Sequence, residues 1–287
     1  MQTFRKLGKG VLLLPGSPTT ILVPSDDGYY VIDPGSKRNR SGLLSSKRIK
    51  GILITHCHSD HVLAAAYIKD GGEGVYAPAV ESCSIKHTGL RSFTTFGGVP
   101  PKTSLLFEVV GVEVNHQFDP PFEIGTLEAL PLPGHTYGQV GYSGKGFLYA
   151  ADSLFGDRLL KRVVIPYHQD HGEALKTLHM LRERYREFKK IVPSHGPVVE
   201  GGKARELIDL NIKHLKKLER KILDLLSRDL TVEELTLRII REGGGKPTPR
   251  SLLLGSITLK SILSSLHSDG KVEPRISDKG IAWSRSR

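Results

Sequence analysis

Cysteine is nearly absent from this sequence, which contains only Cys57 and Cys83 among its 287 residues. Two cysteines cannot build the disulfide framework of a small secreted protein, so we expect a reducing compartment and a cytoplasmic location. Methionine, asparagine and glutamine are also scarce. Because these residues are chemically fragile at high temperature, their scarcity suggests a heat-adapted, thermophilic source.

Long apolar runs are missing as well. No stretch approaches the roughly 18 consecutive apolar residues of a membrane span, so no membrane partner is expected. The tract Val11-Leu12-Leu13-Leu14 is too short for the apolar segment of a signal peptide, and we interpret it as a strand. The hydrophobic content of 38% indicates an ordinary globular protein. The length fits one large domain, or a domain of about 200 residues with a small appendage.

Positive charge is concentrated toward the C-terminus. Residues 201–287 hold 18 Lys and Arg against 11 Asp and Glu, whereas residues 1–200 hold 23 against 19, and the formal net charge is +11. A basic C-terminal segment could attract phosphates, nucleic acid or acidic partners. A solvated helical surface explains the same excess equally well, so charge alone does not decide between the two interpretations.

The first 200 residues alternate short apolar runs with turns. This pattern predicts strands over residues 20–23, 29–32, 49–55, 75–78, 109–114, 126–130, 138–142, 146–150 and 190–193. Helices are expected over residues 60–69 and 172–189, and residues 88–104, rich in Gly, Pro and Thr, are expected to form a loop. Many strands interleaved with helices indicate an α+β fold in which two sheets carry helices on their outer faces.

Helical spacing dominates after Gly201-Gly202. A long helix is followed by the capping-box pattern Thr231-Val-Glu-Glu234, which opens the next helix, and a third helix is expected over residues 256–267. Two short strands, 271–276 and 281–284, end the pattern. Helix, helix, helix, hairpin is the order of a winged-helix unit. We therefore predict a main domain over residues 1–202 and a small helical, winged-helix-like domain over residues 203–287.

Three histidines and an aspartate fall within six positions of His56-Cys57-His58-Ser59-Asp60-His61, directly after an apolar run. Clustered imidazoles and a carboxylate cost desolvation energy unless a positive charge binds among them. Side chains two apart on a strand point to one face, so His56 and His58 can converge at the strand end, where Asp60 and His61 follow. Such ligands suit zinc or a similar metal. The alternative of surface histidines in a loop is disfavoured, because the pattern follows a strand and opens a helix.

The spacing His-x-His-x-Asp-His resembles the signature of the metallo-β-lactamase superfamily. The later motifs of that family occur in the same order, with His135 in a Pro-Gly-His turn, Asp152 after an apolar strand and His195 in a Ser-His-Gly turn. The early Asp33-Pro-Gly35 turn matches too. The resemblance covers about residues 10–200 and implies an αββα four-layer sandwich.

The resemblance also implies a site for two divalent metal ions. The ligands that it assigns are His56, His58 and His135 for one ion, Asp60, His61 and His195 for the other, and Asp152 as a bridge between them. A hydroxide between the ions would be the nucleophile, because two cations lower the pKa of bound water. Asp60 could also orient that hydroxide and carry a proton to the leaving group, which makes it the candidate catalytic residue. Zinc is the first expectation, and iron or manganese would fit the same ligands.

Several neighbouring residues keep two interpretations. Asp33 could orient a ligand or be an ordinary turn aspartate. His168 and His171, with Tyr167, could edge the pocket, although a plain loop before a helix is the favoured interpretation. Cys57 is expected to be a small buried residue rather than a ligand. Residues 62–66 depart from the family pattern, which often has a glycine there, but alanine permits similarly tight helix packing.

The site predicts a metal-dependent hydrolase without naming its electrophile. The segment Asp152-Ser-Leu-Phe155 resembles the glyoxalase II-type branch, which implies thioester hydrolysis, and the same site could open lactones. The C-terminal arrangement resembles the β-lactamase-like endoribonucleases, which implies cleavage of single-stranded RNA and agrees with the basic C-terminal segment. RNA is the favoured substrate on these grounds.

The expected recognition helix weakens the nucleic-acid interpretation. Residues 256–267 contain Lys260 as their only Lys or Arg, whereas a DNA-reading helix usually carries more. The C-terminal unit is therefore expected to pack against the main domain and shape the cleft. A nucleic-acid-binding protein with a structural metal is a further hypothesis. It is disfavoured because structural zinc sites usually use cysteine and close at four ligands.

Overall fold

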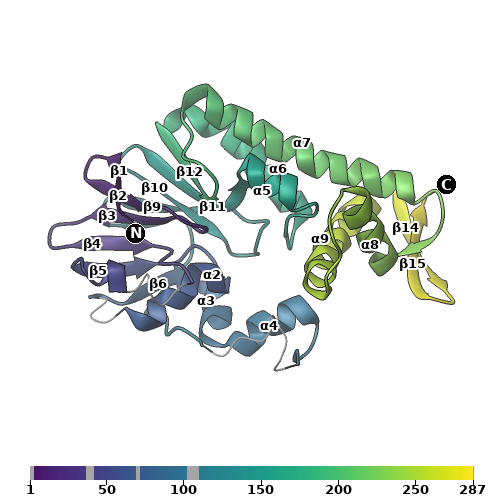
Figure 1. Cartoon of the computed structure of the whole chain (residues 1–287), viewed down its shortest axis with the longest axis horizontal. Coiled ribbons are helices and arrows are strands. Elements are labelled where there is room, and N and C mark those ends of the chain that lie inside the picture. The colour runs from purple at the N-terminus through teal and green to yellow at the C-terminus, as the bar shows by residue number, and fades with distance from the viewer. Residues whose placement is uncertain (1–2, 37–41, 69–71, 102–109, 287) are drawn as a thin grey trace.

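A computed structural model describes residues 3–36, 42–68, 72–101 and 110–286. Two β-sheets pack face to face in the first part of the chain, helices cover their outer faces, and a helical unit with a small hairpin lies at the far end of a long helix (Figure 1). The predicted four-layer α+β architecture is therefore confirmed. None of the helices in these residues combines the length and apolar character that crossing a membrane requires.

The first sheet holds strands β1 to β7 in chain order. The strands are β1 (Arg5–Gly8), β2 (Val11–Leu14), β3 (Thr20–Pro24), β4 (Tyr29–Ile32), β5 (Ile49–Leu53), β6 (Val75–Pro78) and β7 (His116–Phe118). The pairs from β1 to β4 are antiparallel, and those from β4 to β7 are parallel. Strands β3 and β4 are mainly apolar without alternation because both of their faces are buried.

The second sheet has the order β12-β11-β10-β9-β8. Its strands are β8 (Phe122–Ile124), β9 (Leu127–Pro131), β10 (Val140–Gly144), β11 (Phe147–Phe155) and β12 (Lys190–His195). The β11–β12 pair is parallel and the other pairs are antiparallel. All of β11 is buried, so both of its faces are covered although it lies beside the edge strand β12.

Three apolar layers hold the sandwich together. Residues such as Ile21, Tyr142 and Val192 fill the space between the sheets. The first sheet packs outward against the helical segments α2 (Ser59–Val62), η1 (Leu63–Tyr67) and α3 (Ala79–Lys86). The second sheet packs outward against α6 (His171–Arg184), which continues into η2 (Tyr185–Glu187), and against α7 (Gly201–Leu225). Between β11 and α6 lies the short helix α5 (Asp157–Arg162).

Helix α7 joins the sandwich to the C-terminal unit. Its first half contributes Leu207 and Ile208 to the sandwich, and its second half contributes Leu218 and Ile222 to a separate core. That core also contains residues of α8 (Val232–Glu242), α9 (Pro249–Ser268) and a sheet of β13 (Leu230–Thr231), β15 (Gly280–Arg285) and β14 (Val272–Ser277). The boundary at residue 202 and the winged-helix likeness remain predictions.

Two segments of the main domain have a different secondary structure from the one predicted. Within the predicted loop 88–104, residues Thr88–Phe96 form helix α4, and residues 102–104 lie outside the described ranges. Gly97, which adopts a left-handed backbone conformation, ends that helix, so the turn-forming residues mark its boundary and not a loop. The strand predicted over 109–114 is not formed by its described residues 110–114, and the strand that pairs with β6 begins at His116.

Candidate metal centre

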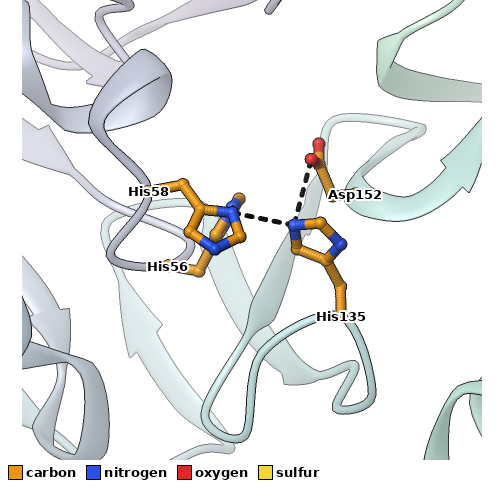
Figure 2. Close-up of side chains that lie close together, drawn as sticks. All are labelled: His56, His58, His135 and Asp152. Carbon is orange, nitrogen blue, oxygen red and sulfur yellow. Dashed lines mark hydrogen bonds and ion pairs between the residues drawn. The ribbon is translucent and has the colours of Figure 1, made fainter. Parts of the chain in front are cut away.

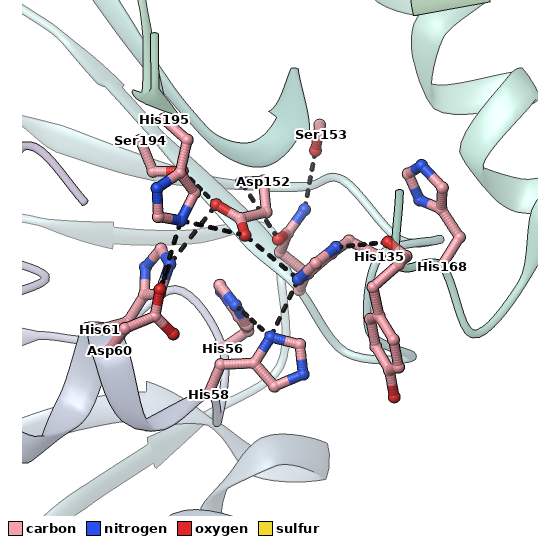
Figure 3. A network of polar contacts seen from close by, with 12 residues as sticks. His56, His58, Asp60, His61, His135, Asp152, Ser153, His168, Ser194 and His195 are labelled. Carbon is pink, nitrogen blue, oxygen red and sulfur yellow. Dashed lines mark hydrogen bonds and ion pairs between the residues drawn. The ribbon is translucent and has the colours of Figure 1, made fainter. Parts of the chain in front are cut away.

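The seven candidate ligands come from four segments that end at one edge of the sandwich (Figure 3). His56 and His58 lie in the turn after β5, and Asp60 and His61 lie in α2, which that turn opens. The other three come from the second sheet: His135 from the loop after β9, Asp152 from β11 and His195 from the end of β12. The face-to-face packing of the sheets therefore brings these distant segments together.

One group consists of His56, His58, His135 and Asp152, whose possible ligand atoms all lie within 4.8 Å of one another (Figure 2). His58 Nδ1 is 3.1 Å from His56 Nε2 and 2.9 Å from His135 Nε2. His135 Nε2 is 3.2 Å from Asp152 Oδ2. Two ligands on one tetrahedral zinc ion are separated by about 3.3 Å, so these spacings match a shared cation.

The second group consists of Asp60, His61 and His195. Asp60 Oδ2 is 3.3 Å from His195 Nε2 and 3.8 Å from His61 Nε2. Asp152 touches this group too, with Oδ1 3.4 Å from His61 Nε2 and Oδ2 3.5 Å from His195 Nε2. Asp152 thus lies between the groups, where a carboxylate could bridge two ions (Figure 3).

The donor set fits divalent cations. The Nδ1 atom of His135 faces the Tyr167 carbonyl at 2.8 Å, so Nδ1 carries the proton and Nε2 presents a lone pair to the cluster. The fully buried Nε2 of His61 lacks a hydrogen-bond partner among the described residues. Converging lone pairs and an orphaned buried nitrogen are unfavourable without a positive charge among them, and a metal ion supplies that charge.

Burial keeps the three histidines of the first group deprotonated near neutral pH. Desolvation lowers the pKa of His58 to about 4 and that of His135 to about 3, and it lowers the pKa of His56 well below its usual value. Protons therefore do not compete with a metal at these nitrogens near neutral pH.

In the second group the pKa of a histidine shifts in the opposite direction. Burial disfavours a charge on His61, but the carboxylates of Asp152, Asp33 and Asp60 outweigh burial and raise the pKa of His61 well above its usual value. Burial likewise opposes ionisation of Asp152, yet the histidines around it hold its pKa well below the usual range. The carboxylates thus create a place for positive charge at this group.

Asp33 acts on His61 and is not an ordinary turn residue. Its Oδ2 accepts from His61 Nδ1 at 2.7 Å and from the Thr55 hydroxyl at 2.7 Å, and its Oδ1 accepts from the Thr55 backbone N–H at 2.9 Å. Asp33 is fully buried and adopts a left-handed backbone conformation with φ of 46°. Such strain persists where surrounding contacts enforce it, and here it aims the carboxylate at a candidate ligand.

Glu81 and Arg91 hold the turn that carries His56 and His58, and the role of Glu81 is one that sequence reasoning missed. Buried Glu81, from α3, accepts from the Cys57 backbone N–H at 2.9 Å and from the Gly138 N–H at 2.8 Å. Arg91, from α4, donates to the Cys57 carbonyl at 2.8 Å. Glu81 therefore ties the turn that carries His56 and His58 to the loop that follows His135. An apolar helix pattern gives no signal for such a contact.

The other residues singled out in the sequence lie in different places relative to the candidate ligands. Tyr167 lines the pocket beside the cluster, whereas His168 lies behind His135 and away from the other candidate ligands (Figure 3). His171 begins α6 and pairs with Glu219 of α7 at 2.7 Å. Cys57 is buried and free, as expected.

Helix α9 supports the segment behind the metal centre. The Thr258 hydroxyl accepts from the His168 N–H at 2.9 Å, and the Ser261 hydroxyl accepts from the His171 N–H at 2.7 Å. Because the adjoining Tyr167 carbonyl holds His135, the C-terminal unit positions a candidate ligand through this segment.

Replacing His168 by Phe is expected to reduce the acid sensitivity of the fold. Burial lowers the pKa of His168 well below its usual value, so below about pH 6.5 the unfolded chain binds the proton that the folded chain refuses. This difference removes about 1.4 kcal/mol of stability per pH unit as pH falls, and the wild type should lose about 2 kcal/mol more than His168→Phe between pH 7 and pH 5. Urea unfolding with a chelator present measures this. Exposed His179→Phe is the control, and equal losses in wild type and His168→Phe would contradict the assignment.

The chain belongs to the metallo-β-lactamase superfamily, because the family model for that superfamily matches residues 13–195. It is similar to a hydroxyacylglutathione hydrolase of Methylobacillus flagellatus, with 30% identity over 129 residues that cover 44% of this chain and 43% of that protein. It is also similar to a probable metallo-hydrolase of Streptococcus pyogenes serotype M6, with 26% identity over 67% of this chain and 84% of that protein. The chain thus spans less than half the length of the hydroxyacylglutathione hydrolases that it matches.

Solved structures resemble the whole chain, including the C-terminal unit. A metallo-β-lactamase family protein of Thermus thermophilus aligns with a TM-score of 0.71 and 18% identity, covering 98% of this chain and all of that chain. A β-lactamase domain protein of Burkholderia ambifaria aligns with a TM-score of 0.70 and 18% identity, covering 99% and 93%. At this identity the likeness shows the fold alone. The superfamily match and the names of these relatives agree with the predicted hydrolase class, and the clustered His and Asp residues agree with the predicted metal site.

Proposed function

We propose that the chain is a metal-dependent thioester hydrolase. The observation that carries this proposal is the meeting of two ligand groups at Asp152, beside a pocket of about 150 Å³ that is lined by His58, Asp60, His135 and Asp152. The similar hydroxyacylglutathione hydrolases support the thioester as the electrophile. The sequence favoured RNA, and the similarity to these hydrolases now gives the thioester the stronger support.

The proposed ligands are the seven predicted residues. His56, His58 and His135 would hold one ion, Asp60, His61 and His195 the other, and Asp152 would lie between them. Zinc is our first choice, and iron or manganese would fit the same nitrogen and oxygen donors. When bound, the ions would supply Lewis acidity that activates water and polarises the substrate carbonyl.

Asp60 is the proposed proton carrier. Its side chain is 43% exposed and lines the pocket, whereas that of Asp152 is 6% exposed. Burial opposes the charge of Asp60, but His61 and His195 hold its pKa below the usual range, so the carboxylate is ionised at neutral pH. In the reaction, water adds its oxygen to the acyl carbon and the carbon–sulfur bond breaks. Asp60 would take a proton from the water and pass it to the leaving thiolate, which gives a carboxylic acid and a thiol.

Cleavage of single-stranded RNA is a second candidate function. The observation that favours it is a set of cations around the site, because Arg91 and Arg250 line the pocket, and Arg158 and Arg162 line a neighbouring cleft of about 860 Å³ that reaches His195. Cations on both sides of a metal centre could hold the phosphates of a strand. Lactone hydrolysis and a structural metal in a binding protein have no such observation in their favour.

A parallel assay on metal-loaded protein tests the proposal. The substrates are S-lactoylglutathione, acetyl-coenzyme A, a labelled single-stranded RNA and a simple lactone, each with and without a chelator. We expect release of thiol from at least one thioester, abolished by the chelator and restored by zinc, iron or manganese. RNA cleavage without any thioester hydrolysis would replace the first candidate by the second. Chelator-resistant turnover would contradict both.

A further inference from the structure

A groove of about 290 Å³ lies between the main domain and the C-terminal unit. One wall is formed by residues 162–167, which follow α5, and the other by residues 245–254, which lead into and begin α9. Three cations line it: Arg162 from the first wall, and Lys246 and Arg250 from the second. Figure 1 shows α9 beside the sandwich, so residues far apart in sequence meet here.

The groove adjoins the metal centre. Tyr167, Arg250 and Leu254 line both the groove and the pocket of the candidate ligands. Arg250 thus lies where the groove meets the pocket of the candidate ligands. At the other end, Arg162 also lines the cleft that reaches His195.

The positive charge of the groove is not compensated. Within the described residues, Arg162, Lys246 and Arg250 form no ion pair, and no Asp or Glu lines the groove. Elsewhere on the surface pairing is common: Lys161, next to Arg162, pairs with Asp157, and Lys279 pairs with Glu234. Unpaired cations along a concave wall focus a positive potential and attract anions.

We propose that this groove binds phosphate groups carried by the thiol half of the thioester, with Arg250 closest to the scissile bond. The proposal rests on thioester hydrolysis as the function. Arginine holds phosphate through paired hydrogen bonds, and several phosphates match several cations. A glutathione thioester fits less well, because its two carboxylates and one ammonium leave a single net negative charge, whereas several phosphate charges match the three cations of the groove. The substrate class is therefore an acyl thioester of coenzyme A type.

The test compares two triple variants with the same change in charge. Arg162→Gln/Lys246→Gln/Arg250→Gln removes the groove cations, and Lys203→Gln/Lys217→Gln/Lys260→Gln removes three exposed lysines that do not line the groove. Desulfo-coenzyme A, which lacks the thiol, probes binding by titration calorimetry on the metal-loaded protein. Acetyl-coenzyme A and S-lactoylglutathione probe turnover.

We expect the groove variant to weaken desulfo-coenzyme A binding, and to raise the KM for acetyl-coenzyme A, by about tenfold or more. The reason is that the loss of several charge-assisted hydrogen bonds lowers the binding affinity by at least that factor. The same variant should change kcat/KM for S-lactoylglutathione by less than about twofold, and the control variant should behave like the wild type.

Several results would overturn the inference: unchanged desulfo-coenzyme A binding in the groove variant, equal losses for both thioesters, or tighter groove-dependent binding of a 2′-O-methyl RNA strand than of desulfo-coenzyme A.

Failure of the proposed function can be distinguished from failure of the groove assignment. Groove-dependent binding of desulfo-coenzyme A without turnover of any thioester would leave the groove assignment standing and reject thioester hydrolysis. Thioester turnover that is equal in the groove variant and the wild type would support thioester hydrolysis and reject the groove assignment.

Discussion

Asp60→Asn is expected to lower kcat by about 10²- to 10⁴-fold, the range typical for loss of a positioned proton-transfer group. The amide has nearly the same shape as the carboxylate, but it can neither take a proton from water nor pass one to the thiolate. Because four other candidate ligands form a complete group of their own, at least one metal ion should remain bound. Steady-state kinetics together with metal analysis measure both effects.

The control for this variant is Asp157→Asn, which removes an exposed carboxylate that pairs with Lys161 and lines the cleft that reaches His195. Its kcat should equal that of the wild type. If Asp60→Asn retained kcat within about threefold of the wild-type value, Asp60 would not be the proton carrier, and its role would be reduced to that of a ligand.

Glu81→Gln is expected to weaken metal binding by about 10- to 100-fold, the typical cost of disturbing a residue that positions ligands. Each Glu81 oxygen accepts a backbone N–H, from Cys57 on one side and Gly138 on the other. In glutamine one of these oxygens becomes an NH₂ group, which would face an N–H donor and leave it unsatisfied. An unsatisfied buried donor costs about 1–3 kcal/mol. The turn carrying His56 and His58 should therefore loosen relative to His135.

Competition with a chelator measures the metal affinity, and thermal unfolding of the metal-free protein measures the structural cost separately. Glu113→Gln, which removes an exposed carboxylate paired with Lys86 of α3, is the matched control and should change neither quantity. If Glu81→Gln bound the metal as tightly as the wild type, the turn with His56 and His58 and the loop with His135 would hold their positions without the Glu81 carboxylate.

Residue chemistry was enough to predict the cluster His56, His58, Asp60 and His61, and the family resemblance supplied the other three candidate ligands, His135, Asp152 and His195. His56, His58, His135 and His195 lie at the end of a strand or in the loop that follows it, whereas Asp60 and His61 lie in α2 and Asp152 lies within β11. Strand ends are visible in the sequence as apolar runs that stop. The start of α9 differs from the prediction, because the glycines and prolines of residues 243–249 indicate a break and the apolar spacing begins the helix only at residue 256. Thr248 and Ser251 form a capping box with Pro249 at the first helical position, which is a local signal for the earlier start. The helix therefore includes Arg250, which the apolar spacing does not reach.

The sequence by itself was enough to predict the candidate ligands and the four-layer sandwich, because the cluster from His56 to His61 is a local pattern and the order of the later motifs resembles the metallo-β-lactamase superfamily. The tertiary structure alone decided which residues hold those ligands and what lines the approach to them. Glu81, Arg91 and Asp33 act through contacts between segments 22 to 57 positions apart in the chain. The groove forms where α9 meets residues 162–167. Such contacts depend on how whole elements pack, which no local pattern encodes.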